Sequence, residues 1–408
     1  MKVHMFSNIK SICSCLFLML LFPMANAFPQ QLIFNQSKLD NIRLDYKESK
    51  GKVRKEYERA VKSILKEGDK ALANDVYSVI DKELLPPSGD RHDYYSTGKY
   101  WWPDPSKPDG LPYIQKDGKV NPDNDKISDS KNMDRFLREM HTLSTAAYIS
   151  GKQEYSQKAE ELLNRWFIDT TTKMNPNLNY AQVKIGYKGL LYSGIIDVNA
   201  MYTLVESVIM LKKCNCISEA TYKGTSKWLE EYFVWLTTSK SGVKESKSEN
   251  NHGSWYDVQV VSLSLFLGKN DFAKSVLEKA KESRFSSQIE PDGRQPLELK
   301  RTLSMNYSCF SLKAFCLLAK MGEKVGVDLW NYEPSSGRGS LKKAVYFLIP
   351  FMNGDKKWET QQIKEFEIDS YIEVFVLAAS KYSDKSIAET AFRKQKKDFQ
   401  GSMKSVLF

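Results

Sequence analysis

Apolar residues recur at three- and four-residue intervals along most of this chain, which is the spacing of amphipathic helices. The period-two alternation of half-buried strands is scarce. We therefore predict a mainly α architecture. The pattern predicts helices over, among others, 53–72, 133–149, 155–167, 198–211, 218–236 and 368–382.

Two helix ends share one pattern, which indicates repeated helical hairpins. In segments 147–155 and 264–272 an apolar helix end is followed by a glycine (Gly151 or Gly268), a short polar turn and an aromatic residue that opens the next helix. Segment 317–322 resembles a third end of this kind. One hairpin cannot bury its own apolar face, so repeated hairpins stack into solenoids or close into toroids.

The first 27 residues have the layout of a signal peptide. Lys2 and Lys10 accompany an apolar run over 12–22, and Ala25-Asn26-Ala27 forms a small-residue cleavage site. The apolar run is too short to span a bilayer, and no later stretch offers the roughly 18 uncharged residues of a membrane helix. We expect an exported, periplasmic or secreted protein without a membrane partner.

The mature chain is large enough for a substantial core and is moderately basic. Its formal net charge of +10 falls to +8 once the two signal-peptide lysines are removed. A basic excess suits an acidic partner, although colloidal solubility explains it equally well. Nucleic acid is a poor candidate for an exported chain without a nucleic-acid-binding motif. The basic run 393–397 is predicted to be only a solvated helix face.

Four cysteines remain after the signal peptide: Cys214, Cys216, Cys309 and Cys316. Zinc-site spacing is absent, and we expect buried thiols that behave as small hydrophobic residues. Cys309 and Cys316 are seven residues apart in a helical pattern, so they share roughly one face.

Segment 250–257 (Asn-Asn-His-Gly-Ser-Trp-Tyr-Asp) holds the strongest candidate chemistry. His252, one of three histidines in the mature chain, follows the amides Asn250 and Asn251 and precedes a Trp-Tyr pair. The amides and the glycine indicate a helix start here. Tyr256 lies four residues after His252 and would share its helix face, but it could equally belong to the core.

Segment 301–308 adds a guanidinium, Arg301, and a phenol, Tyr307. Six helical residues amount to a rotation of about 600°, which leaves the two side chains roughly 120° apart. They converge only if the helix begins after Arg301, and the Pro- and Gly-containing run 291–296 favours such a late start.

This residue set suits β-elimination from a uronic acid. Removal of the C5 proton puts charge into the carboxylate, which donors from Asn251 and His252, with Asn250 in support, can neutralise. A base must take the proton and an acid must protonate the O4 leaving group. Tyr307 can serve both steps if Arg301 lowers its pKa from the usual value of about 10.

Two further clusters could bind sugar rings. Flat aromatic faces flanked by polar groups, as in segment 91–103, suit sugar stacking, with a buried aromatic core as an alternative of equal weight. Segment 174–182 gathers amides around one tyrosine, for which turn chemistry is the alternative. The candidate contacts are Tyr94, Tyr95, Trp101, Trp102, Asn179, Tyr180 and Gln182.

Together these segments resemble the alginate lyase family of exported uronate-polysaccharide lyases. The resemblance spans roughly residues 89–318. Within this group the chain is most similar to polysaccharide lyase family 38 and more distantly similar to family 5. Four ordered motifs carry it: Arg91-His-Asp-Tyr-Tyr95 with Tyr100-Trp-Trp-Pro-Asp-Pro105, Met174-Asn-Pro-Asn-Leu-Asn-Tyr-Ala-Gln182, Asn250-Asn-His-Gly-Ser-Trp-Tyr-Asp-Val-Gln259, and Pro296-Leu-Glu-Leu-Lys-Arg-Thr-Leu-Ser-Met-Asn-Tyr-Ser308.

The resemblance implies an incomplete (α/α) toroid over 28–408, one catalytic domain whose long loops form a cleft or tunnel. It implies Asn251 and His252 as carboxylate neutralisers, with His252 as the alternative base for the opposite C5 epimer. It implies Tyr307 as base and acid, Arg301 as its activating cation, and no metal or other cofactor. Some relatives carry a Gly-Arg-rich stretch where this chain has Gly-Leu-Leu-Tyr-Ser at 189–193, which leaves substrate preference open.

The expected activity is β-elimination of an acidic polysaccharide, most of all mannuronate-rich alginate, with glucuronan as the nearest rival. A toroidal glycoside hydrolase would need two carboxylates, for which Asp93, Asp197 and Asp257 are available. A non-catalytic glycan-binding protein would need the aromatic residues but not Arg301 with Tyr307.

Overall fold

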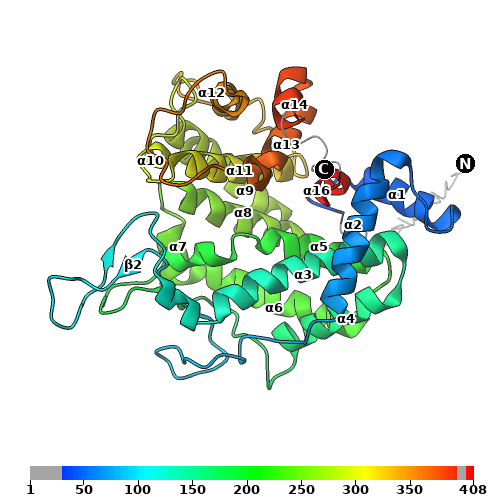
Figure 1. The fold of residues 1–408 in the computed structure, drawn as a ribbon, viewed down its shortest axis with the longest axis horizontal. Coiled ribbons are helices and arrows are strands. Elements are labelled where there is room, and N and C mark those ends of the chain that lie inside the picture. The colour runs from blue at the N-terminus through cyan, green and yellow to red at the C-terminus, as the bar shows by residue number, and fades with distance from the viewer. Residues whose placement is uncertain (1–29, 393–400) are drawn as a thin grey trace, which may run out of the picture.

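Helices make up most of the computed structural model, which describes residues 30–392 and 401–408 (Figure 1). The predicted signal peptide and the basic run 393–397 lie outside the described residues. The principal helices are α1 Gln36–Glu48, α2 Lys55–Leu72, α3 Asp129–Ser150, α4 Gln153–Leu163, α5 Met201–Lys213, α6 Glu219–Thr238, α7 Lys240–Glu245, α8 Asn251–Phe266, α9 Asn270–Ala280, α10 Pro296–Leu299, α11 Ser304–Gly322, α12 Leu341–Asn353, α13 Ile372–Tyr382, α14 Lys385–Phe392 and α16 Lys404–Leu407.

The predicted helices are confirmed, with bounds that move by a few residues. The range 155–167 divides into α4 and a π-helical turn, Asn164–Ile168, and the range 368–382 divides into a 3-10 turn, Ile368–Tyr371, and α13. Helix α3 begins at Asp129, earlier than predicted, because its first turn is polar and carries no apolar periodicity. Apolar spacing therefore located the helices better than it located their ends.

Two of the predicted hairpin turns are confirmed. Gly151 ends α3 with φ +70° and Gly268 follows α8 with φ +71°, so both adopt the left-handed conformation that glycine tolerates best. The third end differs. Helix α11 does end at Gly322, but the residue with positive φ is Gly326, in the turn that follows.

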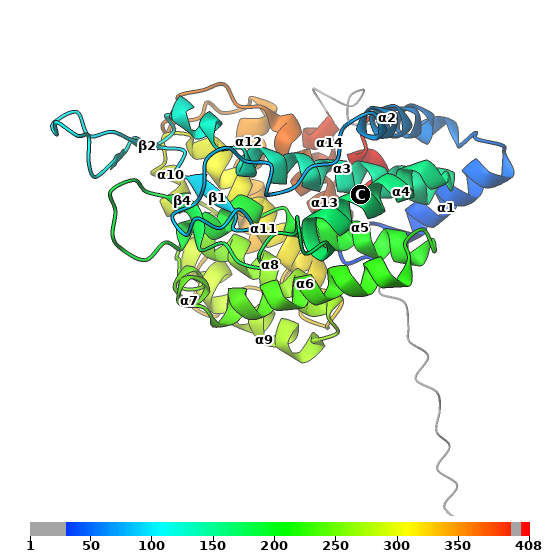
Figure 2. The same ribbon diagram turned by 90° about the horizontal axis from the view of Figure 1, so that it is seen from below.

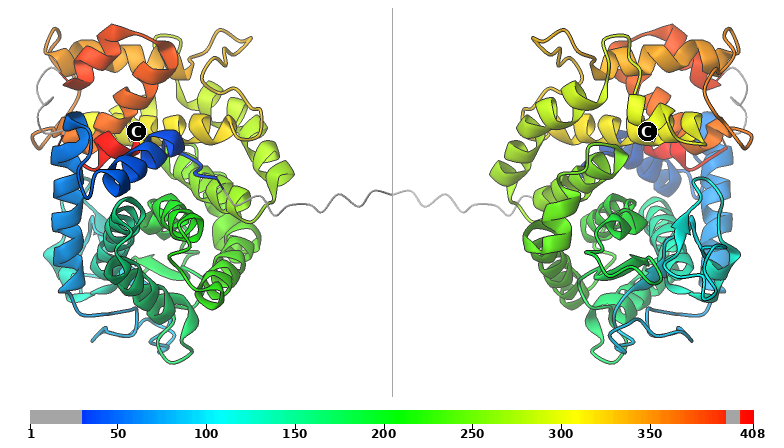
Figure 3. Two further views of the ribbon diagram at one scale, coloured as in Figure 1. Left: turned by 90° about the vertical axis from the view of Figure 1, so that its right-hand side faces the viewer. Right: turned by 90° about the vertical axis from the view of Figure 1, so that its left-hand side faces the viewer.

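The helices pack against one another around a continuous core. Helix α3 contacts α2, α4 and α5, α5 contacts α8, and α8 contacts α9 and α11. Figure 3 shows many of the teal and green helices, from α3 to α8, nearly end-on. The long connections gather at one end of the molecule, where the strands and α7 lie in Figure 2. Helix packing thus leaves one end to the loops that build the site.

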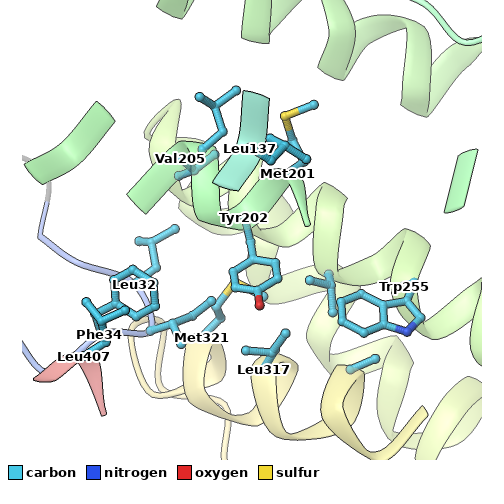
Figure 4. Close-up of a cluster of buried hydrophobic side chains, with 14 of the residues drawn as sticks. Leu32, Phe34, Leu137, Met201, Tyr202, Val205, Trp255, Leu317, Met321 and Leu407 are labelled. Carbon is cyan, nitrogen blue, oxygen red and sulfur yellow. The ribbon is translucent and has the colours of Figure 1, made fainter. Parts of the chain in front are cut away.

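Both ends of the described chain pack into the same part of the core. Figure 4 places Leu32, Phe34 and Leu407 beside Met321 of α11 and near Tyr202 of α5. The Asn35 backbone N–H donates to the Leu407 carbonyl at 2.7 Å. The N-terminal and C-terminal segments therefore stabilise the same helix junction.

The strands are short and belong to loops, as expected from the scarcity of period-two patterns. In the described chain β1 Tyr95–Thr97 pairs in parallel with β4 Tyr180–Val183, and β2 Trp101–Trp102 pairs antiparallel with β3 Ile114–Gln115. The β1–β4 pairing joins the loop after α2 to the loop before α5 and brings two of the predicted sugar-binding segments side by side, whereas β2 and β3 both belong to the loop after α2.

The cysteine prediction is half wrong. Cys309 and Cys316 are buried thiols in α11, as predicted. Cys214 and Cys216 are joined by a disulfide instead, because the chain turns back after α5 through Asn215, which has φ +56°, and brings their Cα atoms to 5.2 Å.

One described helical stretch, Ser193–Lys213, is long and apolar enough by composition to span a membrane. However, 72% of its most apolar window is buried inside the protein. This stretch includes α5, which packs between α3 and α8 as a core helix.

A partly exposed histidine beside the core, His141, should make stability depend on pH. Burial, with a smaller contribution from the Lys313 charge, lowers the pKa of His141 to about 4. Its Nε2 is buried without a hydrogen-bond partner, and its ring stacks on Phe34 with centroids 5.2 Å apart. The folded protein therefore keeps this ring neutral, whereas the unfolded chain takes up a proton below about pH 6.5.

We expect stability that is present above pH 6.5 to be lost as the pH falls towards 4, by up to about 3 kcal/mol from this group. The measurement is denaturant unfolding of the wild type and His141→Phe at several pH values, since phenylalanine preserves the stack without titrating. The difference in unfolding free energy between the two proteins should change between pH 6.5 and pH 4. A constant difference would show that His141 makes no such contribution.

Candidate active site

A cavity of about 580 Å³ lies where the starts of α8 and α11 meet the loops of β1, β2 and β4. The structure brings seven of the predicted site residues to its lining: Trp101, Gln182, Asn250, Asn251, His252, Arg301 and Tyr307.

Helix α8 begins at the amide pair, as predicted. The Asn250 side chain caps the helix by accepting the His252 backbone N–H at 3.2 Å. Position 253 requires glycine because the backbone there packs closely against Ser248, and a Cβ would lie 2.1 Å from the Ser248 carbonyl oxygen. The local sequence thus fixes Asn251 and His252 in the first turn of α8, at the cavity wall.

Glu245, the last residue of α7, orients His252. Its Oε1 lies 2.7 Å from His252 Nδ1, and its side chain is almost fully buried while that of His252 is 22% exposed. The carboxylate favours the tautomer with a proton on Nδ1, so Nε2 is the ring nitrogen left for the cavity. It would also stabilise a positive charge on the ring.

Glu298 of α10 holds Asn251 through both carboxylate oxygens. Oε1 accepts the Asn251 backbone N–H at 2.7 Å and Oε2 accepts Nδ2 at 2.8 Å. Burial raises the pKa of Glu298, while the hydrogen bonds from Asn251 oppose that shift. The Asn251 Oδ1 atom is buried without a partner. This contact fixes the amide beside the cavity.

Arg301 and Tyr307 converge because α11 begins only at Ser304. The Arg301 guanidinium lies over the Tyr307 ring, 3.6 Å from its centroid. Asp117 fixes the guanidinium by accepting from Nε at 3.1 Å and from Nη2, and it also accepts the Thr302 backbone N–H at 2.9 Å. The late helix start that the sequence required is confirmed.

The expected direction of the Tyr307 pKa shift is wrong. Burial raises this pKa, and the Arg301 charge only opposes the shift. Arg301 stacks on the ring face and is itself paired with Asp117, so its charge is partly offset. The Tyr307 hydroxyl donates to the Tyr100 hydroxyl at 3.2 Å, which makes Tyr100 the nearest polar partner of this phenol.

Only one of the predicted aromatic contacts lines the cavity. Trp101 does, and the Lys184 ammonium lies 4.8 Å from its ring centroid. Tyr94 is buried and donates to Asp197 at 3.1 Å, so its predicted sugar contact is wrong. The Trp102 indole donates to the Lys119 carbonyl at 2.9 Å, outside this cavity.

The second predicted tyrosine contact, Tyr256, is also wrong. Its hydroxyl donates to the Leu236 carbonyl at 3.1 Å, and its side chain is buried against α6. The alternative reading, a core residue, is the correct one.

The amide segment contributes one side chain to the cavity. Gln182 lines it and donates to Asp197 at 2.6 Å. Asn179 instead accepts from the Trp235 indole at 3.1 Å. Tyr180 opposes Tyr95 in the β1–β4 pairing, and neither lines the cavity. Strand pairing therefore uses two of the residues predicted to bind sugar, Tyr95 and Tyr180, and leaves the Gln182 side chain at the cavity.

The three aspartates considered for hydrolysis have structural partners. Asp257 pairs with Arg284 at 2.9 Å, and Asp93 accepts from Ser88 and Asn175. Asp197 lines the cavity but accepts from three donors, Tyr94, Ser96 and Gln182. A pair of free carboxylates flanking a scissile bond is not formed by these residues.

Four residues of the site were not among the sequence predictions: Glu245, Glu298, Asp117 and Tyr100. Glu298 and Tyr100 lie inside quoted motifs, so their place in those motifs was the only signal. Glu245 and Asp117 carry no local signal, because their partners are brought to them by tertiary packing. Within the described residues, no group of three or more His, Cys, Asp or Glu side chains is placed to hold a metal ion.

We expect Glu298→Ala to lower both stability and activity. It leaves the buried Asn251 N–H unpaired, which costs about 1–3 kcal/mol, and it releases the amide from the cavity wall. Glu298→Gln is the matched control, because its carbonyl can still accept that N–H. Thermal unfolding and turnover should show a large loss for alanine and a smaller one for glutamine. Equal losses would show that only the charge matters.

The fold and the cavity define a mainly helical enzyme with an imidazole, a phenol and a guanidinium at one site. The sequence model of the alginate lyase family matches residues 78–358, and the chain belongs to that family.

Solved structures have a similar fold. A crystal structure of an alginate lyase from Bacteroides ovatus is 33% identical with a TM-score of 0.86, over 93% of this chain and 99% of that one. Alginate lyase A1-III from Sphingomonas species A1 is 15% identical with a TM-score of 0.55, over 89% and 93%. A histidine-to-alanine variant of A1-III complexed with a tetrasaccharide is 16% identical with a TM-score of 0.55, over 88% and 91%.

No curated protein matches the chain. The prediction of the alginate lyase family is confirmed, and the mostly helical fold is that of A1-III.

Proposed function

We propose that this enzyme cleaves uronate polymers, alginate first of all, by β-elimination between C4 and C5 to give unsaturated oligosaccharides. The observation that carries the proposal is the convergence of Asn251, His252, Arg301 and Tyr307 on one cavity. Amide, imidazole and phenol have distinct roles in elimination from a uronate, and they have no obvious roles in hydrolysis by paired carboxylates.

The substrate carboxylate binds beside Asn251 and His252, where the Asn251 amide and the imidazolium form of His252, which donates from Nε2 while Glu245 accepts from Nδ1, stabilise the charge that develops on it. Tyr307 reacts as the phenolate, after its own hydroxyl proton has left to solvent. It takes the C5 proton, the C5–H electron pair forms the C4=C5 bond, and the C4–O4 bond breaks. O4 leaves with a proton returned from Tyr307. While Tyr307 is a phenolate, the stacked Arg301 charge and a hydrogen bond from Tyr100 stabilise it.

The cavity also suits a polyanionic chain. Lys99, Lys184 and the partly exposed Trp101 lie in its lining, so ammonium groups can bind carboxylates while a sugar ring contacts the indole. The tetrasaccharide complex of A1-III supports an oligosaccharide ligand.

The finer assignments belong to the same proposal. They are placement in polysaccharide lyase family 38, an incomplete (α/α) toroid as one catalytic domain over 28–408, a preference for mannuronate-rich blocks, and export to the periplasm or medium. The motifs and the signal-peptide pattern of 1–27 support them. His252 is the alternative base for the opposite C5 epimer.

The deciding measurement is ultraviolet absorbance during incubation of the mature protein with polymannuronate, polyguluronate and glucuronan in separate reactions. A rise from the conjugated C4=C5 product on one polymer establishes the reaction and names its substrate. New reducing ends without absorbance would instead establish hydrolysis. If neither signal appeared on any of the three polymers, that result would contradict the proposal.

A further inference from the structure

A second cavity, of about 460 Å³, adjoins the catalytic one and takes no part in the mechanism above. Asn250 lines both cavities, and the second also contains Tyr192, Lys244, Lys247 and Leu297. We propose that this distal cavity is a subsite that binds a further uronate unit of a polymer whose reacting unit lies beside His252. The inference rests on the proposed function.

The chemistry of the distal cavity suits a sugar carboxylate. Lys244 and Lys247 are exposed, and neither forms an ion pair with a carboxylate in the described chain, although Glu249 also lines the cavity. The Lys244 ammonium lies 5.7 Å from the Tyr192 ring centroid. Leu297 is 41% exposed. Ammonium groups can thus bind a carboxylate while the ring and the leucine contact the apolar face of a sugar.

The distal cavity is built by fixed elements. Ser239 caps α7 by accepting the Gly242 N–H at 3.0 Å, and Ser241 donates to the Leu191 carbonyl at 2.6 Å, next to Tyr192. A Cβ on Gly242 would lie 1.8 Å from the Leu236 carbonyl oxygen, so α7 packs directly on the end of α6. These contacts hold Tyr192 and Lys244 together without a ligand.

Helix α7 serves both cavities. It carries Lys244 towards the distal cavity, while its last residue, Glu245, orients His252 in the catalytic one. Ser248 of the distal lining donates to Glu245 at 3.1 Å. Figure 2 shows α7 at the end of the molecule where β1 and β4 lie. A polymer that passes Asn250 would therefore contact both sites.

The test is the double variant Lys244→Gln/Lys247→Gln of the full mature chain, assayed on polymannuronate and on a mannuronate trisaccharide. Two exposed ion pairs contribute modestly, so we expect the ratio of kcat/KM for polymer to kcat/KM for trisaccharide to fall about three- to tenfold. The loss should lie in KM for the polymer and should shrink as salt is raised.

Lys240→Gln is the matched control, because Lys240 lies on the same helix but lines neither cavity. An unchanged ratio in the double variant, or an equal fall in the control, would overturn the distal subsite while the lyase assignment stands. Absence of any turnover by the wild type on polymannuronate, polyguluronate and glucuronan would instead overturn the proposed function, and the subsite with it.

Discussion

Tyr307→Phe should abolish turnover and leave oligosaccharide binding nearly unchanged. The substitution removes one hydroxyl, which is the group that takes the C5 proton and returns one to O4, and it keeps the ring on which Arg301 stacks. General acid–base catalysis contributes about 10²–10⁴-fold per step, so we expect a loss of at least 10³-fold in kcat. Initial rates by ultraviolet absorbance and binding by calorimetry measure the two effects.

Tyr100→Phe is the matched control, since it removes the hydroxyl that lies 3.2 Å from the Tyr307 oxygen. We expect Tyr100→Phe to lower kcat only about tenfold, which corresponds to the loss of one hydrogen bond to a charged group. Substantial activity in Tyr307→Phe would move the base to His252. That result would not make Tyr256 the base, because the Tyr256 hydroxyl donates to the Leu236 carbonyl inside the core.

His252→Ala should reduce kcat by about 10²–10³-fold, the effect of removing one donor to a developing oxyanion. The loss should be larger on one C5 epimer if His252 is also the base for that epimer. Equal losses on polymannuronate and polyguluronate would support a purely neutralising role. Glu245→Gln should lie between wild type and alanine, because glutamine still accepts from Nδ1 but no longer stabilises a charged ring.

His252→Ala also needs a stability control. The substitution removes the imidazole partner of the buried Glu245 carboxylate and leaves that carboxylate the hydrogen bond from Ser248 Oγ at 3.1 Å. A buried charge without a charged partner strongly lowers the stability of the folded protein. The double variant His252→Ala/Glu245→Ala removes it and should unfold at a higher temperature while remaining as inactive. Activity restored by the double variant would mean that misfolding, not loss of the imidazole, caused the defect.

The features read correctly from sequence are those set by neighbouring residues. The amide pair before His252 is a helix cap, and the cap forms. The Arg301–Tyr307 pair required a helix that begins between them, and α11 begins at Ser304. Glycines at 151 and 268 end helices through their own backbone freedom. Such features depend on local backbone sterics and short-range hydrogen bonds, which the sequence states directly.

Three of the errors share one cause, burial, which depends on the whole fold and not on the local sequence. Tyr94 and Tyr256 have the aromatic and polar character of sugar contacts, but packing against Asp197 and α6 places both in the interior. The same burial reverses the expected direction of the Tyr307 pKa, because desolvation of the phenolate exceeds the attraction of Arg301. Residue type alone does not say which side of a core a ring will face.

The sequence by itself determined the helical class, the family and the four residues at the centre of the site. Only the tertiary structure decided which groups hold them, since Glu245, Glu298 and Asp117 reach His252, Asn251 and Arg301 across 7, 47 and 184 residues. Periodicity and caps act within a turn or two of the chain. Charge pairing, desolvation and cavity shape arise only when distant segments pack together, and they set the protonation and orientation on which the chemistry depends.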